Sequence, residues 1–584
     1  MWADLLKKIP GWQRPEPPVY DLRTIRAPRL AGRALKLMAV LLELPGFRGW
    51  LRPVLLAQVG LRAFRKYRPN AGLTPLPLHS PEPPVLLLPS CSLTEYETAL
   101  LQAENRKPKT ENGFQPESAL DFHRAYLAGE TTPLKVAQRL LDVIRNLEAS
   151  AVPLRPLIEW DGENLLRQAQ ESMERYQQGR PAGLLDGVPV AIKDEFDLVP
   201  YPTRVGTQVL GTNVATRDAT AVSRLRKAGA LLFGKANMHE LGMGVTGFNP
   251  HHGIARNPYD PERYPGGSSS GPAVAVAVGL CPVALGADGG GSIRIPAALC
   301  GIFGLKATWG RVSSAGQFPL AWSVKHAGPL AATLSDLALA YGVIAGADEN
   351  DPWTLRQPEV DLPRPEPKLP DGLCIGVFVP WFEHTKPEVF RVCLGAVEML
   401  QELGLERKEV EFRGLESARL AHLVSIVSEM LSANTPHFRR KSRFGRDIRI
   451  NLSLAQHLTA TDYVKAQQVR TEVMTALSGV FEEVDLLVTP TTARTAPPIL
   501  ADVAAAGESD LTVQDELMRF VAPFNLTGHP ALSVPCGYDP QGLPVGLQLI
   551  GRPWEEALLL RVGAAFEAKV ARTSPMLHHT LLSG

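Results

Sequence analysis

The chain has 584 residues, of which 45% are hydrophobic and 21% charged, and its 61 lysines and arginines balance 60 acidic residues for a formal net charge of +1. This composition is ordinary for a globular protein, and the charge balance excludes a protein that binds polyanions with its whole surface. The 51 prolines and 50 glycines follow no fixed period, which excludes collagen-like and solenoid repeats.

The sequence predicts a cytoplasmic protein, with peripheral attachment to a membrane as an open alternative. No apolar run reaches the roughly 18 residues that a membrane-spanning helix needs. No secretory signal is visible, because Met1–Lys8 passes into Pro10 and Gly11 without an apolar stretch. The six cysteines form no CxxC pair, and Cys281 and Cys300 lie in apolar runs, as expected for free thiols in a reducing compartment.

Residues 23–68 form a basic, leucine-rich arm. Eleven lysines and arginines in this arm are opposed only by Glu43. Pro45 and Gly46 divide it into two segments, each too short to span a bilayer. Basic residues combined with leucines and Trp50 fit a helix pair that lies in a membrane interface. The alternative is a helical arm that packs on the protein's own core or on a second subunit.

The remaining chain divides into a proline-rich strap and a long α/β region. We interpret residues 1–118 as an N-terminal helical arm and proline-rich strap that either lies on a membrane surface or caps the substrate channel, and 119–584 as the catalytic domain. Thr131–Pro133 is a typical helix start. Apolar strand-like segments alternate with helical ones, which predicts a sheet covered on both faces by helices. The predicted strands are 184–192, 230–233, 374–379, 484–488, 531–535 and 544–550, and the clearest predicted helices are 219–228 and 555–570.

The segment from Tyr264 to Lys306 carries the strongest functional signal. Two glycine–serine turns, Gly266–Gly271 and Gly289–Ser292, flank the apolar run Pro272–Ala287, which suits a buried helix followed by a buried strand. Glycines let backbone N–H groups approach a ligand closely, and serines supply hydroxyls. We therefore expect both turns to converge on one site that carries out acyl transfer on a serine.

Ser292 and Lys193 are the candidate nucleophile and base. Ser292 follows three glycines, so several consecutive N–H groups can bind one tetrahedral oxyanion. A serine hydroxyl needs a base to take its proton, and no histidine lies in this segment. Lys193 ends an apolar run, where burial disfavours the ammonium form. The alternative for Lys193 is an ion pair with Asp194 or with a carboxylate elsewhere.

Three other motif matches lack the context that their chemistry requires. The GSSSG match to a nucleophile elbow around Ser269 follows a polar, proline-rich segment instead of a strand. The GxGxxG match at Gly242–Gly247 follows a helix-like segment, so we expect no dinucleotide site. His239 and Glu240 begin an HExxH motif, but Met243 occupies the second histidine position, so we expect no metal site.

Three motifs resemble the amidase signature family: DGVPVAIKD at Asp186–Asp194, GGSSSG at Gly266–Gly271 and DGGGSIRIP at Asp288–Pro296. Pro272 departs from the family pattern, in which a small residue is commoner, without touching the motif serines. The separations of 75 residues from Lys193 to Ser268 and 24 from Ser268 to Ser292 also match the family's Ser-cisSer-Lys triad.

This resemblance implies the role of each site residue. Ser292 is the expected nucleophile, Ser268 the bridging serine after a cis peptide bond, and Lys193 the base. The expected oxyanion hole is the backbone of Gly289, Gly290, Gly291 and Ser292. Ser269 is expected to add a supporting hydroxyl, with Asp288 and Arg294 behind these groups.

Longer segments, among them GKANMHELGMGVTGFNP and LMRFVAPFNLTGHPALSVPCGYD, resemble plant-type fatty acid amide hydrolases, and APRLAGRALKLMAVLLELP resembles the arm before their core. The resemblance implies an amidase-signature fold, in which a large twisted mixed β-sheet lies between helical layers. It also implies a homodimer without cofactor, metal or nucleic acid. We expect a hydrolase of fatty acid amides and N-acyl amines, such as N-acylethanolamines. The alternatives are a glutaminase-type subunit of a tRNA-dependent amidotransferase, an amidase for acyl-homoserine lactones, and a non-catalytic lipid-binding module.

Overall fold

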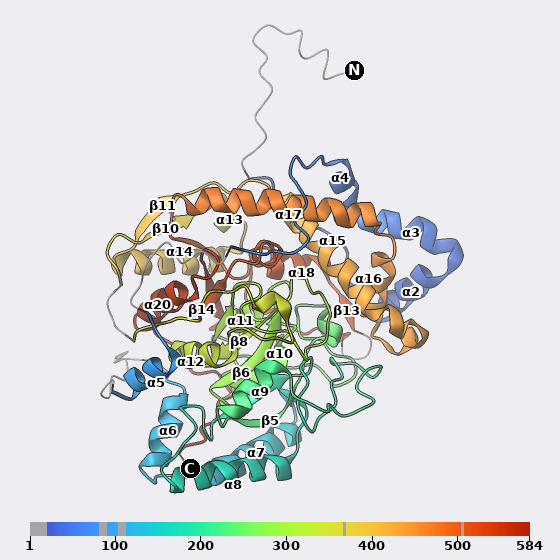
Figure 1. Ribbon diagram of the computed structural model, residues 1–584. Helices are drawn as coiled ribbons and strands as arrows, with labels where there is room; N and C mark the ends of the chain where they lie inside the picture. Colours follow the sequence, from blue (N-terminus) through green and yellow to red (C-terminus); the bar gives the residue numbers. More distant parts are fainter. Residues whose placement is uncertain (1–19, 81–89, 103–112, 366–368, 504–506, 584) are drawn as a thin grey trace, which may run out of the picture.

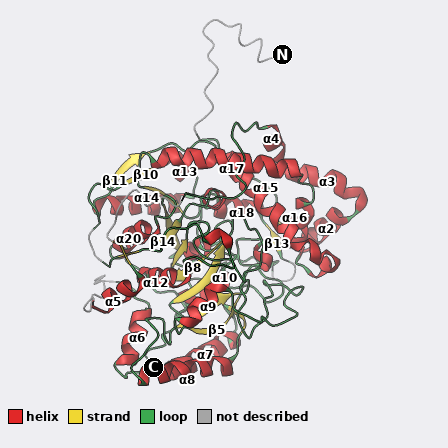
Figure 2. Ribbon diagram, viewed as in Figure 1, coloured by secondary structure: helices red, strands yellow, loops and turns green. Residues whose placement is uncertain are grey.

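The computed structural model describes residues 20–80, 90–102, 113–365, 369–503 and 507–583 (Figure 1). Residues 1–19 and two parts of the predicted strap, 81–89 and 103–112, therefore lie outside the described residues. Figure 2 shows the strands gathered in the middle of the molecule with helices around them. This arrangement confirms the predicted α/β class.

One mixed sheet of eleven strands forms the centre of the molecule. Its two flanks contain parallel pairs, β10 with β11 and β12 on one side and β4 with β5 and β6 on the other, while the pairs between these flanks are antiparallel. In spatial order the strands are β11 (Glu406–Glu409), β10 (Cys374–Val377), β12 (Leu486–Pro490), β15 (Pro544–Ile550), β14 (Ala531–Tyr538), β7 (Phe303–Lys306), β8 (His326–Ala331), β6 (Val283–Asp288), β4 (Pro189–Lys193), β5 (Leu231–Ala236) and β3 (Leu157–Glu159).

Helices from the segments between strands surround this sheet. The helix predicted after Thr131–Pro133 begins at Pro133, and Thr132 caps it by accepting a hydrogen bond from the Lys135 amide. Packed against the sheet or beside it are α6 (Ala119–Leu127), α7 (Pro133–Ala149), α8 (Gly162–Gln177), α9 (Thr220–Lys227), α10 (Ser270–Ala277), α11 (Arg294–Leu299), α12 (Leu334–Ile344), α14 (Pro387–Glu402) and α20 (Glu556–Glu567). A further layer contains α13 (Val379–Phe382), α15 (Leu415–Asn434), the 3₁₀ helix η3 (Thr435–Arg443), α16 (Arg446–Ala455), α17 (Ala460–Phe481), α18 (Leu511–Met518) and α19 (Ala522–Leu526).

The apolar strands were predictable and the others were not. Every predicted strand overlaps an observed one, and β15 has the predicted bounds. The run Pro272–Ala287 forms the end of α10 followed by β6, as expected. The sequence did not indicate β8, whose HAGPLA contains glycine and proline, or β11, whose four residues ERKE are charged and exposed. These strands form because neighbouring strands supply their hydrogen-bond partners.

The N-terminal arm is a set of helices that packs on the layer of α15, α16 and α17. It contains β1 (Leu30–Ala31), α2 (Gly32–Glu43), α3 (Pro45–Gln58) and α4 (Leu61–Lys66), and Pro45 is the first residue of α3, as the predicted break requires. Leu35 and Leu42 of α2 are buried in one cluster with Ile450 of α16. Arg65 forms an ion pair with Asp462 at the start of α17. The arm is therefore part of the folded body, as the packing alternative predicted.

The arm also exposes an apolar row to solvent. Trp50 and Leu37 are 66% and 59% exposed. The other exposed large apolar side chains of helices α2 and α3 and of the junction between them are Val40, Leu44, Phe47 and Val54. Arg33, Lys36 and Arg48 are exposed beside them. Among the described residues, no helix is both long and apolar enough to cross a membrane.

The strap connects the arm to the α/β region. Within it, β2 (Ser90–Cys91) pairs with β9 (Leu362–Pro363), and α5 (Leu93–Gln102) follows. Helix α6 begins at Ala119 after a capping box formed by Ser118 and Asp121. This helix start coincides with the expected start of the catalytic domain, while the division into two domains stays a prediction.

Candidate active site

The two glycine–serine turns meet at the end of two neighbouring parallel strands. β4 ends at Lys193 and β6 at Asp288, and the two strands pair in parallel, so their carboxyl ends lie at the same edge of the sheet. The Ser269 amide donates to the Ser292 carbonyl oxygen at 3.2 Å, which joins the first turn to the second. The Ser269 hydroxyl donates to the Ala287 carbonyl oxygen at 3.1 Å. The two turns thus converge, as the sequence predicted.

Lys193 lies at the centre of this junction. Its Nζ is 2.9 Å from Ser268 Oγ and 3.3 Å from the Ala287 carbonyl oxygen. The peptide bond between Gly267 and Ser268 is cis. Lys193, Ser268 and Ser292 are 1%, 2% and 5% exposed, so all three side chains are shielded from bulk water. Lys193 and Ser268 are therefore direct hydrogen-bond partners, and Ser292 lines the same cavity as both of them.

Glu195 is a site residue that the sequence analysis missed. Its Oε2 lies 2.7 Å from Lys193 Nζ. Asp194 instead lies 3.4 Å from Lys235, so the ion pair of Lys193 is with a carboxylate other than Asp194, as the second form of the alternative expected. The available signal was the position of Glu195 in the turn directly after Lys193, which keeps the two residues close in space.

Two lysines share this buried carboxylate. Burial raises the pKa of Glu195, but the charges of Lys193 and Lys325 outweigh that effect and bring the pKa below its usual value. Burial lowers the pKa of Lys325 to about 8, against the opposing effect of Glu195. The Glu195 carboxylate therefore carries its charge at neutral pH, directly beside the Lys193 side chain.

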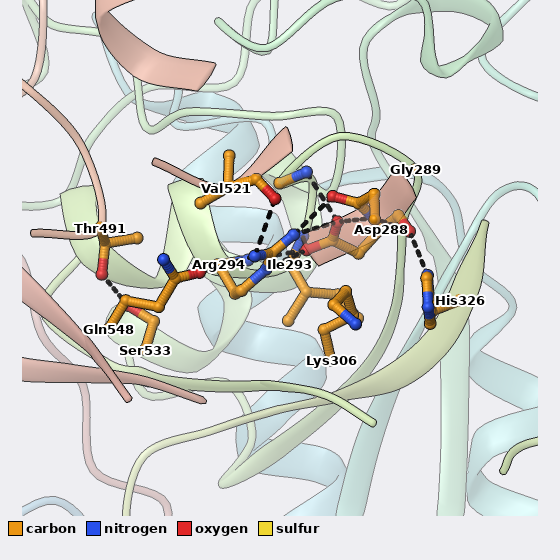
Figure 3. A network of polar contacts seen from close by, with 12 residues as sticks. Asp288, Gly289, Ile293, Arg294, Lys306, His326, Thr491, Val521, Ser533 and Gln548 are labelled. Atoms are coloured by element: carbon orange, nitrogen blue, oxygen red, sulfur yellow. Dashed lines mark hydrogen bonds and ion pairs between the residues drawn. The ribbon is translucent and has the colours of Figure 1, made fainter. Parts of the chain in front are cut away.

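A buried ion pair holds the second turn (Figure 3). Asp288 and Arg294 have fully buried side chains, and Arg294 Nε lies 3.0 Å from Asp288 Oδ2. Burial raises the pKa of Asp288, but Arg294 holds it well below the usual range of a carboxyl group. Arg294 also donates to Gln548 Oε1 and Asn525 Oδ1, each at 2.6 Å. The turn is therefore fixed to β15 and α19.

The same ion pair decides which amides of the turn are available. The Gly291 amide, one of four in the predicted oxyanion hole, donates to Asp288 Oδ1 at 2.6 Å. No hydrogen bond joins the amides of Gly289, Gly290 and Ser292 to another described residue. Three of the four predicted amides thus have no protein acceptor among the described residues, whereas the Gly291 amide is engaged by Asp288.

A cavity of about 210 Å³ opens from these residues into an apolar space. It touches Lys193, Ser268, Ser292 and the glycines Gly289 and Gly290. The arm lines it with Leu30, Met38, Leu55, Leu56, Gln58, Val59 and Leu61, and the layer above the sheet lines it with Leu420, Leu423, Val424, Ile426, Val427, Met430, Ile450, Leu454 and Leu458. The arm therefore supplies part of the apolar wall of the cavity that reaches Ser292.

This chain is similar to amidases in sequence and in structure. The profile of the Amidase family matches residues 140–560. A fatty acid amide hydrolase of Oryza sativa subsp. indica is 39% identical over 97% of this chain and 96% of its own length. A glutamyl-tRNA(Gln) amidotransferase subunit of Chloroflexus aggregans is 38% identical over 76% of this chain and 94% of its own length. A crystal structure of an amidase has a TM-score of 0.69 at 32% identity, covering 78% of this chain and all of its own.

The alignments differ in how much of this chain they cover. Only 3% of this chain lies outside the alignment with the rice protein, so most of residues 1–118 lie inside it. The alignment with the amidotransferase subunit spans nearly the whole of that protein, yet it leaves about a quarter of this chain uncovered. The chain is thus similar in length to the rice protein and longer than the amidotransferase subunit.

We predict that Arg294→Met destabilises the protein by about 3–5 kcal/mol, because it leaves Asp288 charged and buried without its partner. Chemical denaturation followed by circular dichroism measures this loss. Arg145→Met is the control, because Arg145 and Asp142 form an exposed ion pair, which is expected to contribute at most about 1 kcal/mol. Equal effects of the two substitutions would contradict the structural role of the buried pair.

Proposed function

Because this chain belongs to the Amidase family and is a hydrolase that acts on amides, we propose that it cleaves fatty acid amides and related long-chain N-acyl amines. The observation that carries this proposal is the apolar cavity that reaches Ser268 and Ser292. Apolar side chains bind an acyl chain by removing its surface from water, at about 25 cal/mol per Å² of buried apolar area. A polar substrate such as glutamine has little apolar area to bury, so the apolar lining of this cavity contributes little to its binding.

The proposed reaction proceeds through an acyl-enzyme on Ser292. As a neutral amine, Lys193 takes the Ser268 proton while Ser268 takes that of Ser292, and Ser292 Oγ attacks the amide carbonyl carbon. The amides of Gly289, Gly290 and Ser292 bind the resulting oxyanion. The proton returns through Ser268 to the amine as the carbon–nitrogen bond breaks. Water then attacks the ester and releases the fatty acid. No step in this scheme requires a cofactor.

Two other substrate classes remain as outcomes of a test. Similarity to an amidotransferase subunit favours a glutaminase reaction, and acyl-homoserine lactones share the long acyl chain of the proposed substrates. Hydrolysis by the purified protein of an N-acylethanolamine series from 2 to 18 carbons, an acyl-homoserine lactone and glutamine distinguishes the three. The homodimer stays a prediction.

We further propose that the arm draws substrate from a membrane surface. The arm helices carry three kinds of side chain: buried residues that pack on α16, cavity-lining residues such as Met38 and Leu55, and the exposed row around Trp50. The exposed row and its neighbouring arginines suit a lipid interface. An acyl chain that leaves the bilayer at this row would pass into a cavity with walls from the same helices.

We predict that Ser292→Ala lowers kcat on a long-chain N-acylethanolamine by at least about a thousandfold, because the substitution removes the nucleophile. Liquid chromatography of released fatty acid measures the rate, and thermal melting tests the fold. Ser270→Ala is the matched control, since it removes a buried serine hydroxyl that donates to the Asn237 carbonyl oxygen, outside the proposed catalytic groups. Near-normal turnover by a folded Ser292→Ala protein would show that another group is the nucleophile.

For Lys193, we predict that Lys193→Ala and Lys193→Arg both lose about a thousandfold or more in kcat, because a guanidinium keeps its charge and cannot accept the Ser268 proton. Lys235→Arg is the control for placing arginine at a buried lysine on the adjacent strand. If Lys193→Arg retained a tenth of the activity, Lys193 would serve only as a structural cation.

For the arm, we predict that the double substitution Phe47→Ser and Trp50→Ser weakens binding to phosphatidylglycerol-containing vesicles at least about tenfold. Activity on a vesicle-borne long-chain amide should fall with it, whereas activity on a soluble short-chain amide should not change. Leu127→Ser, at an exposed leucine on α6, controls for the loss of surface hydrophobicity. A uniform loss on both substrates would mean that the arm only stabilises the fold.

A further inference from the structure

We propose that His422 is a positioning residue that orients the oxyanion-binding amides from behind the glycine turn. The proposal rests on the assignment of Ser292 as the nucleophile, and it adds a residue from a helix far away in the sequence. His422 lies on α15, more than a hundred residues after the turn. Its Nε2 is 2.8 Å from the Gly289 carbonyl oxygen.

This bond fixes the direction of the next amide. A carbonyl oxygen only accepts hydrogen bonds, so Nε2 of His422 carries the proton and donates it. In a planar trans peptide unit, the C=O and N–H bonds point in opposite directions. Holding the Gly289 carbonyl toward His422 therefore turns the Gly290 N–H away from the His422 ring, which is not part of the cavity lining. Gly289 and Gly290 both line the cavity, so this amide is directed to the side where a ligand lies.

The preceding peptide unit is held in the same way. The Asp288 carbonyl oxygen accepts from Asn525 Nδ2 at 3.0 Å and from His326 Nδ1 at 3.3 Å, and the bond to His326 is drawn in Figure 3. By the same planarity, the Gly289 N–H points away from these donors. The carbonyls of Asp288 and Gly289 are thus held by hydrogen bonds from residues outside the cavity lining. This leaves the amides of Gly289 and Gly290 free to bind one oxyanion.

His422 is suited to a fixed, neutral role. Its side chain is buried, and burial lowers its pKa to about 4 although the bond to Gly289 opposes this effect. The ring therefore keeps a single proton at neutral pH. A Cβ atom added to Gly290 would lie 3.0 Å from Cε1 of His422 and 2.8 Å from Cε of Met518. The ring thus contacts the turn closely, and only glycine leaves it room.

The helix that carries His422 also lines the acyl cavity. Its neighbours Leu423, Val424 and Ile426 belong to the cavity lining, whereas His422 lies behind the turn. A ligand packed against α15 therefore contacts the same rigid element that holds the Gly289 carbonyl. This geometry lets binding of the acyl chain contribute to transition-state stabilisation at the carbonyl.

The test compares His422→Leu with His422→Gln in the full-length protein. Glutamine keeps a donor on a similarly long side chain, and leucine does not. We expect His422→Leu to lower kcat/KM on a dodecanoyl amide by about 10- to 100-fold, less than the 10²–10³ typical of losing an oxyanion donor itself. His422→Gln should recover most of this loss. Ser425→Ala is the matched control, because Ser425 lies on α15 like His422 and its hydroxyl accepts a buried hydrogen bond from Gln467 of α17, so the substitution does not touch the turn.

A transition-state analogue separates positioning from simple packing. Ser292 adds to the carbonyl carbon of a dodecyl trifluoromethyl ketone, its proton passes to Lys193, and the ketone oxygen becomes an oxyanion. We expect the inhibition constant of this ketone to rise in His422→Leu by the same factor as kcat/KM falls, while that of dodecanol changes less than twofold. Equal weakening of both inhibitors, or an equal loss in Ser425→Ala, would overturn the proposal.

The two proposals fail in different ways. If the wild-type protein cleaves short amides but not dodecanoyl amides, the proposed substrate class is wrong, and the same comparison proceeds with a short trifluoromethyl ketone and its matching alcohol. If the protein cleaves dodecanoyl amides but His422→Leu is as active as wild type, only the role of His422 is wrong.

Discussion

The ion pair between Asp288 and Arg294 is the interaction on which the arrangement of this site depends. A charge without solvent is tolerated only when its partner and further hydrogen bonds compensate for the lost hydration. Asp288 meets this requirement by accepting from Arg294, from Asn525 and from the Gly291 and Ile293 amides. These requirements fix the backbone of the turn that ends at Ser292. Because Arg294 also contacts Gln548, the turn is tied to the middle of the sheet.

The division of hydrogen bonds within the turn explains how one short segment both holds its shape and keeps amides free. Asp288 engages the Gly291 amide, while His422 and Asn525 engage carbonyl oxygens on the outer side. Every one of these partners lies away from the cavity, so the inner side keeps unpaired donors. An unpaired buried amide is costly, and such a cost is reasonable where a ligand oxygen supplies the missing acceptor.

In the apolar part of the site, the arm is likewise fixed by one set of contacts while other faces of its helices stay free. Packing of Leu35 and Leu42 on α16 makes the arm part of the core, and Leu55 and Leu56 then complete the wall of a cavity that starts at Ser292. A row of exposed apolar residues is left on the outer side of the same short helices. The two expectations for the arm, packing on the core and contact with a lipid surface, are therefore compatible, because different faces of its helices serve them.

Much of this protein follows from the sequence alone, because its signals are local. Glycine–serine turns beside an apolar run predicted a site at Ser292, the end of another apolar run added Lys193, and the resemblance to the amidase signature family implied the role of Ser268. Apolar strand segments predicted an α/β sheet. Pro45 marked the break between two arm helices, since proline is favoured at a helix start. The tertiary structure decided what depends on long-range contacts. Strands β8 and β11 carry no apolar pattern of their own, and their backbone groups are satisfied only by neighbouring strands. Likewise, His422 and Asn525 carry no local signal for the site, because only the packing of α15 and α19 against the turn brings their side chains within hydrogen-bond distance of it.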